Sequence, residues 1–156
     1  MAKEKESRFA KTVNIKNKRA SFEYEFLEKF VAGLSLQGTE IKSIRQSQVN
    51  MGDAHCGFQN DEMWVFNLHI SPYEEGNMFN HEPMRPRKVL LKRREINRLK
   101  TKSEEKGLTI IPVRLFINDK GLAKLEIALA RGKKTHDKRE SIKERDIQRE
   151  LSRMKF

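Results

Sequence analysis

The 156-residue sequence contains a single cysteine, Cys56, so no disulfide can form within the chain. Its low cysteine content agrees with a reducing compartment. No apolar run approaches the roughly 20 residues that span a bilayer. The start of the chain, residues 1–6, also lacks the apolar stretch of a secretory signal peptide. We therefore expect a cytoplasmic protein that has no membrane partner.

Catalytic patterns are also missing, including the Walker loop, the GxSxG elbow and the HExxH motif. Metal-ligand spacings are absent among the cysteine and the histidines, which are His55, Cys56, His69, His81 and His136. The adjacent His55 and Cys56 are the best candidates for a thiol nucleophile and its base. Neighbours on a strand point to opposite faces, however, so the two should not share a site. The sequence predicts no enzymatic activity, no cofactor and no metal.

Charge is what this sequence has in abundance. Charged residues make up 35% of the chain, above the usual quarter. Lys and Arg number 33 against 22 Asp and Glu, which gives a net charge of +11. Such a balance favours a polyanionic partner. Because the sequence argues against a membrane, nucleic acid is the expected partner.

The charge is segregated along the chain. Residues 1–20 carry a net +5, residues 85–106 a net +7 and residues 131–156 a net +5. Residues 21–84 carry −7, and residues 107–130 carry +1. Basic segments placed around a neutral or acidic core are typical of proteins that neutralise phosphates. For any one segment, a solvated face of mixed charge is an equally good interpretation.

Hydrophobic patterning predicts a mainly β core within residues 13–132, after a flexible arm at residues 1–12. A short helical turn begins at Thr39, where Ile41 and Ile44 recur at helical spacing. The longest helix is expected over residues 88–106, with Gly107 as its stop. Strands are expected over residues 20–30, 34–38, 53–58, 63–70, 108–117 and 122–130, with a loop over 71–87. These elements predict a small barrel resembling the OB fold, a class that often binds nucleic acid.

Residues 133–156 form a basic tail. The polar run over residues 132–139 has little apolar surface to pack and should be flexible in the free protein. Ser141 and Glu144 have the spacing of a capping box and predict a helix from residue 142 onward. Because an isolated helix of about 15 residues is marginal in water, we expect the tail to be disordered when free and helical on a partner. A helix docked on its own barrel is the alternative.

Several stretches of the sequence resemble the SsrA-binding proteins, the SmpB family, in the same order along the chain. They are Asn17-Lys-Arg-Ala20, Gly38-Thr-Glu-Ile-Lys-Ser-Ile-Arg45, His69-Ile-Ser-Pro-Tyr73, Arg85-Pro-Arg-Lys88, Ala130-Arg-Gly-Lys-Lys134, His136-Asp-Lys-Arg139 and Ile142-Lys-Glu-Arg145. The resemblance implies an OB-like adaptor of bacterial trans-translation that binds the tRNA-like domain of tmRNA, with one copy of the protein per tmRNA. It also implies that elongation factor Tu joins the complex that delivers alanyl-tmRNA to stalled ribosomes. The tail would enter the decoding centre and the vacant mRNA channel of the small subunit.

The resemblance also implies two sets of RNA-binding residues. On the barrel, tmRNA would contact Asn17, Lys18, Arg19, Glu40, Lys42, Arg45, Arg87, Lys88 and Lys124. In the tail, the ribosome would contact Gly132, Lys133, Lys134, His136, Asp137, Lys138, Arg139, Lys143, Arg145 and Arg149. Glu40 cannot favour a phosphate, so it either accepts from a base or ribose, orients Lys42, or caps the helical turn.

Two positions depart from the family pattern. Val31 replaces a glutamate that is frequent in the family, so that RNA contact is not expected here. Asp146 and Ile147 stand where family tails often carry an aromatic residue, although Ile147 keeps an apolar anchor. Composition alone leaves another possibility open, a basic ribosomal protein or general RNA chaperone with an OB-like fold.

Overall fold

The computed structural model describes residues 13–76, 79–105, 107–133 and 135–154, and the predicted N-terminal arm lies outside these ranges. The protein is mainly β, as predicted. The strands are β1 (Asn14–Lys16), β2 (Tyr24–Leu34), β3 (Val49–Asn50), β4 (His55–Gln59), β5 (Glu62–Phe66), β6 (His69–Ile70), β7 (Arg87–Leu90), β8 (Leu108–Ile117) and β9 (Ala123–Gly132). The helices are α2 (Lys18–Glu23), α3 (Gly38–Arg45), α4 (Arg93–Ser103) and α5 (Thr135–Met154). In the described ranges, no helix combines the length and hydropathy needed to cross a bilayer.

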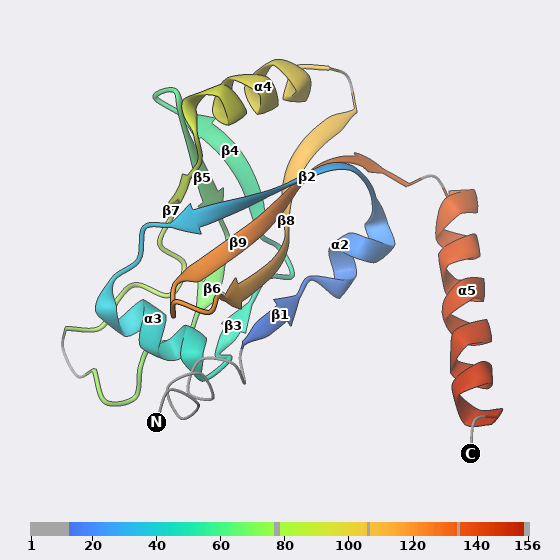
Figure 1. The fold of residues 1–156 in the computed structure, drawn as a ribbon, viewed down its shortest axis with the longest axis horizontal. Coiled ribbons are helices and arrows are strands. Elements are labelled where there is room, and N and C mark those ends of the chain that lie inside the picture. The colour runs from blue at the N-terminus through green and yellow to red at the C-terminus, as the bar shows by residue number, and fades with distance from the viewer. Residues whose placement is uncertain (1–12, 77–78, 106, 134, 155–156) are drawn as a thin grey trace.

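The main sheet closes into a barrel. Its strands follow the order β1-β8-β4-β5-β7-β2-β9, and β9 also pairs with β8, so the sheet closes at β8, which pairs with β1 as well. Figure 1 shows this ring with α4 at one end and α3 at the other. Inside lies one apolar core that includes Met63, Val65, Leu115, Leu125 and Ile127. The predicted OB-like barrel is therefore confirmed.

Two hairpins form where the sequence predicted them. β8 has the predicted bounds, and β9 is joined to it by the turn at residues 118–121, where Gly121 has φ of +80°. β4 and β5 meet at Asn60 and Asp61, both with positive φ. Two central residues in the left-handed region are typical of the tight hairpin turns that suit the twist of a sheet. The alternation of apolar residues and the residue types at the turns were sufficient to predict both hairpins.

The predicted strand over residues 20–30 is wrong in its first part. The Asn17 side chain accepts a hydrogen bond from the Ala20 backbone and caps α2, so residues 18–23 are helical. Ala20 packs against Ile111 and Ala130, which favours this turn over a longer strand. β2 then continues through Gly33, and the separate strand expected over residues 34–38 does not form. A Cβ at Gly33 would lie 3.4 Å from the Leu90 Cβ, which is an ordinary van der Waals contact.

The helix predicted over residues 88–106 is shorter than expected, because its first part is β7. Val89 is buried, and β7 pairs with both β5 and β2. Burial in the core therefore overrides the helical spacing of Val89 with Ile96 and Leu99. The predicted stop at Gly107 is also wrong, because the helix ends at Ser103 with Glu104 as its C-cap. Gly107, with φ of +85°, instead lies in the turn just before β8.

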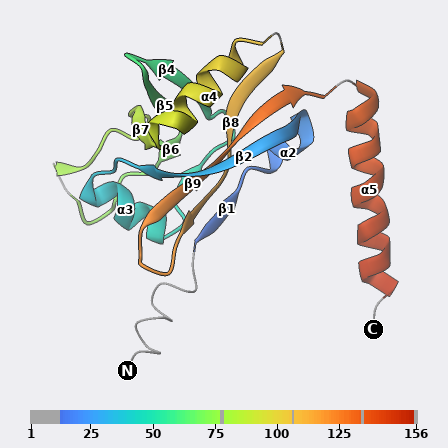
Figure 2. The same ribbon diagram turned by 45° about the horizontal axis from the view of Figure 1, so that its top comes forward.

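The tail helix α5 begins at Thr135, earlier than the predicted start at residue 142. Residues 135–140 contain no glycine or proline, and Lys138, Arg139 and Glu140 are good helix formers, so the helix can extend back through the run expected to be flexible. Figures 1 and 2 show α5 standing apart from the barrel, with α2 as its nearest element. The Arg145 guanidinium lies 5.3 Å from the centre of the Phe22 ring. That the tail orders only on a partner stays a prediction.

Candidate nucleic-acid interface

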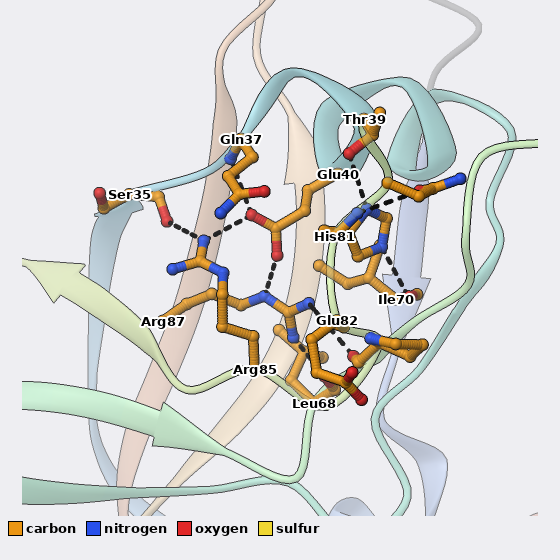
Figure 3. Close-up of polar contacts among 12 residues, drawn as sticks. Ser35, Gln37, Thr39, Glu40, Leu68, Ile70, His81, Glu82, Arg85 and Arg87 are labelled. Carbon is orange, nitrogen blue, oxygen red and sulfur yellow. Dashed lines mark hydrogen bonds and ion pairs between the residues drawn. The ribbon is translucent and has the colours of Figure 1, made fainter. Parts of the chain in front are cut away.

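Glu40, predicted to face RNA, lies in the interior at the start of α3 (Figure 3). One carboxylate oxygen accepts from the Gln37 backbone at 2.7 Å and from Arg85 at 2.5 Å, and the other pairs with Arg87. Burial alone would raise its pKa, but the hydrogen bonds from Arg85, Gln37 and Arg87 together lower it. Glu40 is therefore ionised at neutral pH. It occupies the capping position that the sequence left open as its alternative role.

Arg87 is also fully buried, and its guanidinium donates to backbone carbonyls as well as to Glu40 (Figure 3). The acceptors are the carbonyls of Leu68, Glu82 and Pro83. Burial lowers the pKa of Arg87 despite this pairing. Arg87, at the start of β7, thus ties α3 to the segment before this strand. A direct contact of either side chain with RNA would require this cluster to open.

His81 fastens the same segment from another side. Its Nδ1 lies 2.9 Å from the Thr39 hydroxyl, and its Nε2 lies 2.8 Å from the Ile70 carbonyl. The ring is buried. Together with Glu40 and Arg87 it fixes the orientation of α3 relative to the barrel, and therefore of the basic side chains that α3 carries.

Asn17 is another predicted RNA ligand that the fold uses internally. It is buried, and besides capping α2 its amide donates to the Pro112 carbonyl at 2.9 Å and the Met51 carbonyl at 3.3 Å. Both ends of the amide are thus occupied within the protein. Asn17 positions Lys18 and Arg19 at the first turn of α2.

The structure brings Arg45 and Lys124 together at one groove. This groove of about 400 Å³ lies between α3, β2 and the end of the β8–β9 hairpin. Leu90 and Leu122 line it and remain 48% and 54% exposed. Lys42, also on α3, extends over the Tyr73 ring at 5.4 Å. Basic side chains beside exposed apolar surface can hold both the phosphates and the sugar or base faces of RNA.

Lys18 lies in a second hollow, the cleft between α2 and α5, whose volume is about 710 Å³. Arg145 and Arg149 of the tail face the same cleft, with Glu144 as an acidic neighbour. Lys133 also lines it, donating its Nζ to the Ser21 carbonyl at 3.1 Å. The structure thus brings one predicted barrel residue together with several predicted tail residues.

Arg19 and Lys88 are paired with acids of the barrel. Arg19 contacts Glu23 at 3.2 Å and Asp53 at 3.0 Å, and Glu23 raises its pKa. Lys88 lies 3.8 Å from Glu62, which also pairs with Arg93. Neither residue reaches the Arg45 groove or the α2–α5 cleft. The predicted barrel residues therefore do not form one patch.

The remaining tail residues are placed only in part. Gly132 ends β9 and is exposed, and Lys143 and Arg139 are exposed on α5. Lys134 lies outside the described residues. His136, Asp137 and Lys138 lie on α5, but their side chains are outside the described part of the chain. Their predicted contacts with the ribosome stay predictions.

Three basic residues that the sequence analysis missed lie on the outer face of the sheet. Lys16 of β1 is opposite Arg114 of β8, and Lys29 of β2 is near Glu126 of β9. The signal was available in the β8–β9 hairpin, because pairing its strands about the turn places Arg114 opposite Glu126. Arg114 lies in residues 107–130, where the small net charge of +1 drew attention only to Lys124.

The best thiol candidate is not reactive. Cys56 points into the core while His55 is exposed, so the two face opposite sides of β4, as predicted. Burial raises the pKa of the Cys56 thiol to about 12, which leaves almost no thiolate at neutral pH. In the described ranges, no three His, Cys, Asp or Glu residues are grouped to hold a metal ion.

Comparisons with known proteins agree with each other. The family model described as SmpB protein matches residues 14–155. An SsrA-binding protein of Cytophaga hutchinsonii is 57% identical over 146 residues, which cover 94% of this chain and 95% of the relative. That of Flavobacterium psychrophilum is 56% identical over 145 residues, which cover 93% of this chain and 97% of the relative.

A solved structure resembles the fold as well. A chain in the structure described as "tmRNA-SmpB: a journey to the center of the bacterial ribosome" is 43% identical to this one. The TM-score is 0.68, and the match covers 79% of this chain and 86% of that chain. Sequence and structure thus point to the same family.

Proposed function

The chain belongs to the SmpB protein family, and from this premise we propose that it is the tmRNA-binding adaptor of bacterial trans-translation. It binds the tRNA-like domain of tmRNA and helps to deliver alanyl-tmRNA to stalled ribosomes. Its relatives are SsrA-binding proteins, and the similar solved chain comes from a tmRNA–SmpB structure. The protein works in the cytoplasm as a non-catalytic adaptor without a cofactor, with one copy per tmRNA and with elongation factor Tu in the delivery complex.

One observation supports this function best, the division of basic surface between a rigid barrel and a projecting helix. The Arg45 groove lies beside the buried Glu40–Arg87 pair, which holds α3 in place. The tail helix stands apart from the barrel, beside α2, with Lys143, Arg145 and Arg149 exposed. Such a protein can hold one RNA on its barrel and present its tail to another. The barrel takes the tRNA-like domain, and the tail enters the decoding centre and the vacant mRNA channel.

The residues with direct RNA roles are those whose side chains reach the surface in or beside the Arg45 groove and the α2–α5 cleft. On the barrel these are Lys42, Arg45 and Lys124, with Lys18 at the α2–α5 cleft. Asn17, Glu40 and Arg87 act indirectly by positioning α2 and α3. This assignment narrows the predicted set without changing the function.

RNA affinity tests the barrel part of the proposal. The full chain should bind a tRNA-like domain more tightly than an unrelated duplex of equal length. Arg45→Ala/Lys124→Ala should weaken that binding and lower its salt slope by about two, roughly one per lost phosphate contact. Arg94→Ala/Lys102→Ala removes the same charge from α4, at the other end of the barrel, and should leave both quantities unchanged. Equal affinities for the two RNAs would refute the proposal.

Truncation tests the division of labour between barrel and tail. The cut belongs after Lys133, because Arg131 and Gly132 of β9 pair with β2 and the Lys133 backbone donates to the Glu23 carbonyl. A chain of residues 1–133 should keep most of its affinity for the tRNA-like domain and lose tagging activity on stalled ribosomes. Complete loss of both would contradict the proposed division, because the barrel alone would then not hold the tRNA-like domain.

The RNA that co-purifies with the chain distinguishes the proposed adaptor from a ribosomal protein or a general RNA chaperone. The adaptor should enrich one small RNA that accepts alanine. A ribosomal protein would instead co-purify in equal amounts with ribosomal subunits, and an RNA chaperone would recover many unrelated RNAs.

A further inference from the structure

The outer face of the barrel carries a hollow that none of the predicted RNA-binding residues lines. Its volume is about 450 Å³, and strands β1, β2, β8 and β9 form it. Lys16, Lys29 and Arg114 line it, with Glu126 as the acidic residue. Three cations against one carboxylate leave an excess of positive charge at the surface. A polyanion is therefore the ligand that this hollow fits.

The cations in this hollow are held in position. The Glu126 side chain, only 14% exposed, lies 3.2 Å from the Arg114 Nε and 3.9 Å from the Lys29 Nζ. Arg114 also lies over the Phe116 ring at 4.1 Å, and Lys29 over the Phe26 ring at 5.6 Å. Side chains fixed in this way lose less conformational entropy when they bind a ligand. The guanidinium keeps further N–H donors that Glu126 does not use.

This hollow adjoins the α2–α5 cleft. Lys16 and Ser21 line both of them. Together the two hollows are lined by seven basic and two acidic residues, and the acidic ones are Glu126 and Glu144. The basic residues are Lys16, Lys18, Lys29, Arg114, Lys133, Arg145 and Arg149. We name this set the basic track. It runs from the outer sheet face past α2 to the tail helix.

We infer that the basic track is an RNA-backbone binding site that joins the barrel to the tail. The inference rests on the proposed function, because it assumes that an RNA bound by the barrel lies within reach of the tail. Successive phosphates form a row of negative charges, and a row of cations matches that pattern better than it matches a compact anion. Glu126 is a positioning residue, since it acts by orienting Arg114 and Lys29.

Exposed lysines of the track give the cleanest test. Lys16 is exposed and Lys29 is 54% exposed, so Lys16→Ala/Lys29→Ala removes two cations and leaves the Arg114–Glu126 contact in place. We expect weaker binding of the full chain to the tRNA-like domain and a salt slope lower by about two. The control Arg94→Ala/Lys102→Ala should behave like the unaltered protein. If the lysine variant matches the control, the inference is wrong.

A second variant separates charge from folding. Lys16→Arg/Lys29→Arg keeps both charges and should keep the affinity and the salt slope, whereas a loss in this variant too would overturn the phosphate contact. The groove variant Arg45→Ala/Lys124→Ala distinguishes this inference from the proposed function. If only the groove variant weakens binding, the proposed function stands and the basic track is wrong. If the unaltered chain shows no preference for the tRNA-like domain, the proposed function itself fails.

Discussion

Residues 85–106 and the residues of the basic track both carry a clear excess of positive charge, but the fold uses the two groups of cations differently. In the first region most cations meet a carboxylate of the barrel. Arg93 lies 2.9 Å from Glu62, Arg98 lies 3.0 Å from Glu28 and Lys100 lies 2.7 Å from Asp61. The track has seven cations and two acids. Net charge along the sequence therefore does not identify the cations that face a ligand.

The difference has an electrostatic consequence. An exposed ion pair contributes little to stability, about 0–1 kcal/mol. It does, however, place a negative charge beside each cation and so weakens the attraction of that surface for phosphate. The Asp61 pKa is lowered by its hydrogen bond to Lys100, so this carboxylate stays ionised at neutral pH. The most basic segment of the sequence is therefore not its best candidate for RNA binding.

In the buried Glu40–Arg87 pair the cation is used entirely inside the protein. Breaking this pair should therefore have the largest effect on stability. Arg87→Met leaves the Glu40 carboxylate with Arg85 and the Gln37 backbone N–H, and leaves the Leu68 carbonyl without its Arg87 donor. We expect a loss of about 3–5 kcal/mol in the free energy of unfolding, measured with urea. Arg93→Met, which removes a 55% exposed cation from its acid, should cost no more than about 1 kcal/mol. Equal losses would show that burial does not distinguish the two regions.

The stability that the Glu40–Arg87 pair contributes should depend on pH, because it requires the ionised carboxylate of Glu40. The folded-state pKa of Glu40 lies below its ordinary 4.5, so its stabilising contribution is present above that value and is lost as the pH falls through the folded-state pKa. Urea unfolding from neutral pH into this range should therefore show a steeper fall for the unaltered protein than for Glu40→Gln. Glu40→Gln should be less stable at neutral pH, and the gap should narrow in acid. A gap that stays constant would contradict the assigned pKa.

The smallest effect is expected from a variant that makes the surface of residues 85–106 resemble the basic track, by removing a carboxylate that pairs with its cations. Glu62→Gln removes the carboxylate that Lys88 and Arg93 share. We expect a rise in affinity for unrelated RNA duplex of about twofold, with little change in stability, because the released cations can then attract phosphate. The matched control is Glu75→Gln, whose carboxylate accepts from the Tyr73 hydroxyl instead of a cation. The affinity of both variants for the duplex would be measured at low salt. An equal rise in the two affinities would show that pairing with a cation does not matter.

Local signals were sufficient where one turn and two alternating strands define a unit. The β8–β9 and β4–β5 hairpins are of this kind. Helical spacing was likewise enough to predict the turn at α3. They were insufficient at residues 18–23 and 87–90. There the state of the chain depends on distant partners, such as Pro112 for the Asn17 amide and Leu34 for Val89.

The sequence by itself determined a mainly β barrel, its polyanionic partner and, through its motifs, its family. These follow from composition, period and turn chemistry, which are local properties of the chain. The tertiary structure alone decided which charges face outward. Asn17, Glu40 and Arg87 were expected at the RNA surface and lie inside, while Lys16, Lys29 and Arg114 gather on one outer face. Burial and pairing depend on residues far apart in the sequence, so only the closed barrel could separate the cations that hold the fold from those available to RNA.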